Sequence, residues 1–257
     1  MLLVIDIGNT NTSLGVFEGE KLAAHWRLTT ARSRTVDEWG VHTRNLFALA
    51  GLDFKSIDAI AIASVVPPLN FTLKQMSETY FHLTPLFIDH TINTGVPILY
   101  DPPSDVGADR IVDAVAAIQK YGAPCIVVDF GTATTFDAIN AKGEYLGGVI
   151  TPGITISSDA LFERAAKLPR VEIKRPQRVI GSTTVEAMQS GLYHGYAGLV
   201  DGILKEMIDE LGGAPKIIAT GGLAPLIAKG SEFIQEVDQN LTLDGLRLVY
   251  ERVAGLH

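Results

Sequence analysis

Hydrophobic and polar positions form strand-like patterns near residues 1–30 and 123–152, and each region is followed by helical patterns. The apolar runs at residues 2–7 and 125–130 each carry an acid near their end and lead into a glycine-containing turn. A second strand-like stretch, another turn with glycine and a third apolar run follow in both places. These two meanders predict a β-sheet in each half of the chain.

The two meanders also resemble each other residue by residue. With the two aspartates superimposed, the matched positions are Asp6 with Asp129, Val4 with Val127, Gly8 with Gly131, and Thr12 with Thr135. Two strand–turn–strand units can match by chance, but the shared Asp-x-Gly spacing favours duplicated halves.

Helices and single strands follow each meander. The capping box from Thr35 to Glu38 predicts a helix that ends near Ala50. Residues 59–66 predict a buried strand, and residues 216–222 predict another that runs into a glycine turn. A long helical pattern begins near Thr183 and ends at the glycine pair 212–213.

The predicted fold is therefore α/β, with two mixed sheets flanked by helices. We expect domains at residues 1–118 and 119–257, joined near residues 115–124, with the segment 121–124 as the joint. Ligands of such a protein are expected to bind in a cleft between the halves.

Composition narrows the class of protein. The 257 residues are 47% hydrophobic and 19% charged, as in a compact globular chain. The formal net charge of −8, with no basic patch interleaved with aromatics, argues against nucleic-acid binding. No apolar stretch approaches the ~20 residues of a membrane span, and no basic segment precedes the first apolar run, so we expect a cytoplasmic protein. The single cysteine, Cys125, opens an apolar run and is expected to be buried and inert.

The turns after the two acids are the candidate chemistry. Residues 6–12 read Asp-Ile-Gly-Asn-Thr-Asn-Thr, and residues 129–135 read Asp-Phe-Gly-Thr-Ala-Thr-Thr. A tight glycine turn exposes backbone N–H groups to a phosphate, and Asn and Thr side chains add donors. Asp6 is placed to hold magnesium, directly or through water. One such turn is equally well an ordinary hairpin, but two copies favour a nucleotide site.

A third turn, Thr-Gly-Gly at residues 220–222, follows the late strand and is weak evidence by itself. Neither a Walker A pattern nor a Rossmann glycine pattern occurs in the sequence.

These three turns, in this order, resemble the superfamily of actin, hexokinase and the heat-shock chaperone ATPases. Within it, three further motifs resemble the type III pantothenate kinases: Gly-Ala-Asp-Arg at 107–110 after Tyr-Asp-Pro-Pro at 100–103, Gly-Gly-Val-Ile-Thr-Pro-Gly at 147–153, and Gly-Ser-Thr-Thr at 181–184. The resemblance covers nearly the whole chain. It implies two ribonuclease-H-like domains in an actin-like ATPase fold and transfer of the ATP γ-phosphate to the 4′-hydroxyl of pantothenate, the first step of coenzyme A synthesis.

The resemblance also implies residue roles. The ATP ligands would be Asp6, Ile7, Gly8, Asn9, Thr10, Asn11, Thr12, Ser13 and Thr132. The pantothenate ligands would be Tyr100, Gly107, Ala108, Asp109, Arg110 and Thr184. Asp109 would be the general base. Asp129 would bind a monovalent cation, potassium or ammonium, in addition to the magnesium at Asp6. The active form would be a homodimer in which Thr184 reaches a neighbouring subunit's site.

The residues alone leave several of these roles open. Asp109 precedes a helical pattern and could be only an N-cap. Arg110 could orient the substrate carboxylate or pair with a nearby acid, and Tyr100 could be a half-buried aromatic of the core. Asp129 could be a second magnesium ligand or merely end its strand.

Two other functions also fit the fold. One is another kinase of the superfamily, acting on a sugar, acetate or an acyl group, against which the segment from Tyr100 to Arg110 argues. The other is a non-enzymatic relative that serves as a transcriptional accessory factor. Asp109 together with both phosphate turns favours catalysis.

Overall fold

The computed structural model describes residues 1–256 and divides them into two compact units. The first contains residues 1–96, 100–116 and the C-terminal segment from 241, and the second contains residues 97–99 and 117–240. The chain therefore passes between the units on either side of residues 97–99, inside a helix after Ala116, and again after Asn240.

The first unit holds a five-stranded sheet in the order β3-β2-β1-β4-β5. Its strands are β1 (Leu2–Ile7), β2 (Asn11–Glu18), β3 (Lys21–Thr29), β4 (Ala59–Ser64) and β5 (Leu86–Ile88). Its helices are α1 (Val36–Leu49), α2 (Pro67–Met76), most of α3 (Ala108–Tyr121) and α7 (Leu241–Val253). β1 pairs antiparallel with β2 and parallel with β4, so the sheet is mixed as predicted.

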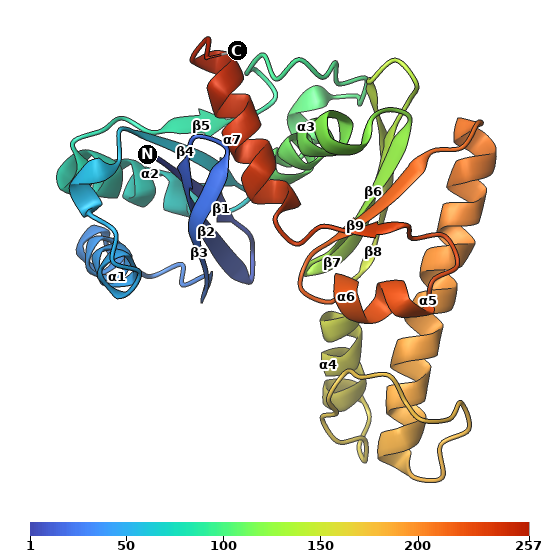
Figure 1. Cartoon of the computed structure of the whole chain (residues 1–257). Coiled ribbons are helices and arrows are strands. Elements are labelled where there is room, and N and C mark those ends of the chain that lie inside the picture. The colour runs from blue at the N-terminus through green and yellow to red at the C-terminus, as the bar shows by residue number, and fades with distance from the viewer. Residues whose placement is uncertain (257) are drawn as a thin grey trace. The chain divides into compact units, whose positions relative to one another are not determined.

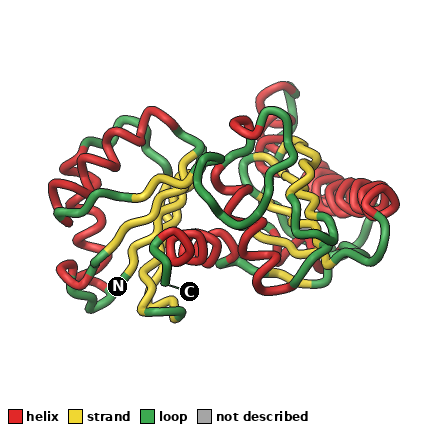
Figure 2. Tube along the Cα trace, turned by 90° about the horizontal axis from the view of Figure 1, so that it is seen from above, coloured by secondary structure: helices red, strands yellow, loops and turns green. Residues whose placement is uncertain are grey.

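Helices cover both faces of this sheet (Figures 1 and 2). Alternate residues of β1, Leu3, Ile5 and Ile7, enter a core with Trp39 of α1 and Leu73 of α2. The other face lies against α7. The period of two in a strand therefore sets which β1 side chains face each layer.

The second unit repeats the same sheet order, β8-β7-β6-β9-β10. Its strands are β6 (Cys125–Phe130), β7 (Ala133–Ile139), β8 (Tyr145–Pro152), β9 (Lys216–Thr220) and β10 (Glu236–Val237). Its helices are α4 (Ile154–Arg164), α5 (Thr184–Leu211) and the short α6 (Ala224–Ile227). Side chains of β6 and β7 pack on α5 and α6, for example Phe136 with Leu192 and Ile227. The two mixed sheets flanked by helices confirm the predicted fold class.

Several predicted boundaries agree with the structure. The capping box forms as expected, since Glu38 N–H donates to Thr35 Oγ1 at 3.3 Å and Thr35 N–H donates to the Glu38 carboxylate at 2.7 Å. The long helix α5 ends where predicted, because Gly212 and Gly213 both have positive φ, 73° and 75°. Cys125 is fully buried, and burial raises the pKa of its thiol to about 12.

The division of the chain differs from the predicted domains at 1–118 and 119–257. Helix α7 packs on β1, β2 and β4, so the C-terminal segment belongs to the first unit. The chain changes unit after Ala116, inside the expected range of 115–124, whereas the narrower segment 121–124 lies within the second unit. Sequence order does not reveal such a return of the chain, because an amphipathic helix shows that one face is buried but not which sheet buries it.

Candidate active site

The first candidate site is the turn that joins β1 to β2. Asp6 and Ser13 lie directly opposite each other on the two strands, and both are half-buried. Gly8 N–H donates to the Asn11 carbonyl at 2.9 Å and closes the turn. A Cβ atom at Gly8 would lie 2.9 Å from that carbonyl, so a larger residue would force the turn open. Asn9 and Thr10, at its tip, are exposed.

Two residues that follow β3 brace this turn. The Thr30 hydroxyl donates to the Gly8 carbonyl at 2.7 Å and lies 2.9 Å from the Thr12 hydroxyl. Thr30 N–H donates to the Thr10 carbonyl at 2.9 Å, and Arg32 Nη2 donates to Asn9 Oδ1 at 3.1 Å. Sequence reasoning missed both Thr30 and Arg32. The available signal was the meander itself, because a third strand paired with the second must end beside the first turn.

The second turn, between β6 and β7, is built alike but is one residue shorter. Asp129 lies opposite Thr135 just as Asp6 lies opposite Ser13. The match of Thr12 with Thr135 is therefore wrong by one position, because the gap-free superposition ignored the shorter turn. In the structure, Thr12 is equivalent to Thr134, and both side chains are fully buried.

Glycines pack closely around this second turn. A Cβ atom at Gly153, the residue before α4, would overlap the carbonyl oxygen of Thr132. A Cβ atom at Gly221, which follows β9, would overlap Asp129 Oδ1, and one at Gly131 would lie 3.0 Å from its Oδ2. The Asp129 carboxylate thus lies between two residues without side chains, and Thr132 is exposed at the tip.

Asp109 lies in the first turn of α3, which begins at Ala108. Ile111 N–H donates to the Gly107 carbonyl at 3.2 Å, and Arg110 N–H donates to Asp109 Oδ1 at 2.8 Å. Asp109 is therefore inside the helix, and the alternative that it is the N-cap is wrong. Burial raises the pKa of the Asp109 carboxyl, and hydrogen bonding and charge from Arg110 oppose that rise only in part.

The segment from Gly107 to Arg110 lies at the same edge of the first sheet as the first turn. A Cβ atom at Gly107 would lie 3.2 Å from the Val65 side chain. Val65 N–H in turn donates to the carbonyl of Ile7, the residue before the turn, at 3.0 Å. Tyr100, half-buried, begins the same stretch of this unit. The structure thus brings together two of the predicted groups, the first phosphate turn and the Asp109 segment.

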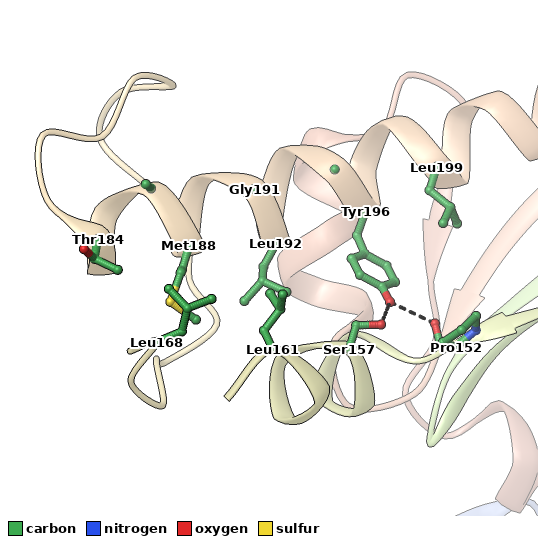
Figure 3. A pocket seen from close by; sticks show the side chains of 12 residues that line it. Pro152, Ser157, Leu161, Leu168, Thr184, Met188, Gly191, Leu192, Tyr196 and Leu199 are labelled. Carbon is green, nitrogen blue, oxygen red and sulfur yellow. Dashed lines mark hydrogen bonds between the residues drawn. The ribbon is translucent and has the colours of Figure 1, made fainter. Parts of the chain in front are cut away.

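Thr184 belongs to the second unit, where it is the first residue of α5 and is exposed. Thr183 precedes it as the N-cap and accepts a hydrogen bond from Glu186 N–H at 3.2 Å. Thr184 lines a cavity of about 700 Å³ between α4 and α5. Figure 3 shows its largely apolar wall, with Leu161, Met188, Leu192 and Leu199, and the Tyr196 hydroxyl that donates to the Pro152 carbonyl at 3.0 Å.

Within residues 1–256, no three His, Cys, Asp or Glu side chains lie close enough together to hold a metal ion by themselves. The same described residues contain no helix long and apolar enough to cross a membrane.

The geometry can now be compared with known proteins. A family model for type III pantothenate kinase matches residues 2–206. The type III pantothenate kinase of Koribacter versatilis is 61% identical over 98% of this chain and 96% of its own length. That of an Anaeromyxobacter species is also 61% identical, over 98% of this chain and 99% of its own. The chain belongs to the type III pantothenate kinase family.

Solved structures support the fold of this type III pantothenate kinase family member. A putative Baf family transcriptional activator from Campylobacter jejuni matches with a TM-score of 0.59 at 20% identity, over 98% of this chain and 99% of that one. The ROK hexokinase of Thermus thermophilus matches with a TM-score of 0.52 at 13% identity, over 98% and 99% of the two chains. At these identities the likeness shows the shared actin-like ATPase fold alone.

Proposed function

We propose that this chain is a pantothenate kinase, which transfers the γ-phosphate of ATP to the 4′-hydroxyl of pantothenate in the first step of coenzyme A synthesis. Family membership over nearly the full chain supports this activity. The observation that carries it is the common sheet edge of the first turn and the Asp109 segment. A phosphate donor and a residue able to accept a hydroxyl proton are both needed there.

The nucleotide phosphates bind to residues 6–13, with a further contact from Thr132. The braces from Thr30 use the backbone carbonyls of Gly8 and Thr10, so they hold the shape of the turn through its main chain. Preorganised donors of this kind bind phosphate at little reorganisation cost. Asp6 supplies a carboxylate for Mg²⁺, directly or through water. The magnesium, when bound, neutralises charge on the phosphates.

Asp109 serves as the general base, and the residues around it bind pantothenate. The backbone of Gly107 and Ala108 lies close to the bound pantothenate. Arg110 faces the substrate carboxylate, and the aromatic ring of Tyr100 forms one side of the pocket. The raised pKa of the Asp109 carboxyl supports the assignment, because a base is more effective when its pKa approaches the working pH.

Asp129 holds a monovalent cation, potassium or ammonium. The missing side chains of Gly131 and Gly221 let the backbone come close to this carboxylate. Carboxylate and backbone carbonyl oxygens are the hard ligands that such an ion prefers. A cation there offsets the charge that ATP brings to a protein of net charge −8.

The active form is a homodimer, and Thr184 acts in the partner's site. Four glycines, Gly191, Gly195, Gly198 and Gly202, lie on one exposed face of α5. A Cβ atom at each would meet nothing within 4 Å, so nothing in this chain requires glycine there. Each costs about 1 kcal/mol of helix stability relative to alanine. Close packing of a helix from the partner subunit would require small residues at these positions. The exposed Leu161 and Phe162 of α4 extend the apolar surface.

The activity is tested by ADP release from MgATP, with pantothenate set against a panel of sugars, acetate and short acyl acids. We expect ADP release with pantothenate and with none of the other acceptors. Release with a sugar or acetate instead would favour another kinase of the superfamily, and no release with any acceptor would favour the non-enzymatic relative.

A further inference from the structure

The proposed nucleotide site lacks a positively charged side chain. Residues 6–13 carry one acid, Asp6, and no Lys or Arg, and Asp129 adds another acid at the second turn. Arg110, in the pantothenate group, is the one cation among the assigned site residues. Backbone N–H groups and magnesium offset part of the charge of a triphosphate, but an acidic protein gains from a cation held at the turn itself.

Arg32 occupies such a position. Its Nη2 donates to Asn9 Oδ1 at 3.1 Å, at the exposed tip of the first turn. A guanidinium carries five N–H donors in a planar fork, so one bond to Asn9 leaves the others for a ligand. Among residues 1–256, no acidic side chain forms an ion pair with Arg32. The chain thus holds an exposed guanidinium beside the phosphate turn without neutralising it.

The backbone around Arg32 is fixed independently of the arginine. Thr30, two residues earlier, bonds to Gly8 and Thr10 through both its hydroxyl and its N–H. β3 ends at Thr29, which pairs with Asn11 at the start of β2. These contacts keep the segment that carries Arg32 against the turn, so the side chain reaches the tip at a small entropic cost.

The second turn has no counterpart of this arginine. In the equivalent place, β8 ends at Pro152, which pairs with Ala133, and Gly153 then packs against Thr132. Gly153 therefore corresponds to Thr30, and Thr155, on α4, corresponds to Arg32. Both halves have the turn, but only the first has an arginine at this position.

We propose that Arg32 is a further nucleotide-binding residue, which contacts the phosphate chain of ATP while Asn9 holds its guanidinium. The inference rests on the proposed nucleotide site at the first turn and adds to it a cation that donates hydrogen bonds. Charge-assisted bonds to phosphate are about twice as strong as neutral ones. Arg32 thereby recognises the phosphates rather than the adenosine.

The test measures binding of MgATP and of adenosine by calorimetry, without pantothenate, to the wild type and to Arg32→Ala, Arg32→Lys and Arg44→Ala. Arg44 is an exposed arginine of α1 and controls for the loss of one charge. We expect Arg32→Ala to weaken MgATP binding about 10- to 100-fold, the range for one charge-assisted hydrogen bond. Arg32→Lys should lose less, since it keeps the charge but not the fork. Adenosine binding should not change, and the MgATP defect should shrink at high salt.

A second comparison separates direct contact from mere support of Asn9. If Arg32 contacts phosphate, Arg32→Ala weakens MgATP binding further in an Asn9→Ala background. If the double variant binds no more weakly than Asn9→Ala alone, Arg32 acts only through Asn9 and the proposal is overturned. Unchanged MgATP binding in Arg32→Ala, beside a clear defect in Asn9→Ala, also overturns it while keeping the nucleotide site. Unchanged binding in both variants shows that the nucleotide site itself lies elsewhere.

Discussion

Burial and the proposed catalytic role of Asp109 are linked through the pKa of its carboxyl. Its carboxyl is half-buried in the first turn of α3, and burial raises its pKa. A helix N-terminus and the adjacent Arg110 N–H favour the ionised form, but they do not cancel the cost of burial. The residue is therefore held in a state that costs stability at neutral pH and suits proton transfer.

Asp109→Asn should lower turnover about 10²- to 10⁴-fold, the usual loss when a general base is removed. MgATP binding should remain near the wild-type value, because the proposed nucleotide ligands lie in the first turn. Steady-state kinetics and calorimetry measure the two effects. A variant that keeps most of its turnover would show that Asp109 has only a structural role.

The raised pKa also predicts the pH dependence of stability. A carboxyl whose pKa is higher in the folded state than in the unfolded state binds its proton more tightly when folded. Its contribution to the free energy of unfolding therefore falls as the pH rises from the unfolded-state pKa through the folded-state pKa. Asn in place of Asp109 removes this term. Thermal unfolding should show Asp109→Asn to be as stable as the wild type or more stable at pH 7, and to lose this advantage below pH 4. A large destabilisation of Asp109→Asn at pH 7 would contradict the raised pKa of the Asp109 carboxyl.

At the scale of elements, the two β-meanders share one plan and differ in what supports each turn. The first turn is braced by Thr30 and Arg32, and the second by the close packing of Gly153 against Thr132. Gly153 has a φ of −70°, which any residue can adopt, so only its missing Cβ matters.

Gly153→Ala should therefore displace the second turn. Overpacking of this kind typically costs about 1–3 kcal/mol, and the displaced Thr132 should also weaken MgATP binding. Ile156→Ala, at an exposed position in α4, the helix that follows Gly153, is the matched control and should bind MgATP normally. Thermal unfolding and calorimetry test this. Normal MgATP binding by Gly153→Ala would remove the second turn from the nucleotide site.

Helix α5 carries the prediction for assembly. Gly195→Trp places a large side chain on the exposed glycine face, which should split the dimer in sedimentation experiments. Because Thr184 is proposed to act in the partner's site, kcat/KM for pantothenate should fall while MgATP binding persists. The monomer should stay folded, since glycine is the poorer helix former. Ala48→Trp, exposed on α1, controls for added bulk. A fully active monomer of the glycine variant would refute the trans role of Thr184.

Patterning predicted the elements better than their partners. The strands, the capping box and the glycine end of α5 follow from local periodicity and turn chemistry, which a single sequence contains. The braces at Thr30 and Arg32 depend on strand register, and the placement of α7 depends on which sheet it packs against. Strand register and helix placement are properties of the tertiary structure, which local sequence patterns do not determine. The one-residue error at Thr135 arose in the same way, because turn length is set by three-dimensional pairing.

At the scale of the whole molecule, net charge is the main constraint on binding ATP. ATP brings about four negative charges to a chain of net charge −8, and Asp6 and Asp129 add acids at the two turns. Magnesium, a monovalent cation and Arg32 together would offset this charge.

Turnover should rise steeply when potassium or ammonium replaces sodium, and Asp129→Ala should abolish that response. Potassium should also raise the melting temperature of the wild type but not of Asp129→Ala, because an ion that binds only the folded state stabilises it. Asp129→Asn, which keeps the size of the side chain, separates loss of charge from loss of packing. Equal rates and equal melting temperatures in sodium and potassium would leave Asp129 as a magnesium ligand or a strand end.

The most direct test of the proposed activity is the identity of its product. The wild type, given MgATP and pantothenate in potassium buffer, should form one phosphate monoester per ADP released. Phosphorus and proton NMR should place the new phosphate on the 4′-hydroxyl oxygen of pantothenate. A phosphate on another group, or ADP release that leaves pantothenate unmodified, would contradict the assignment of this chain as a pantothenate kinase.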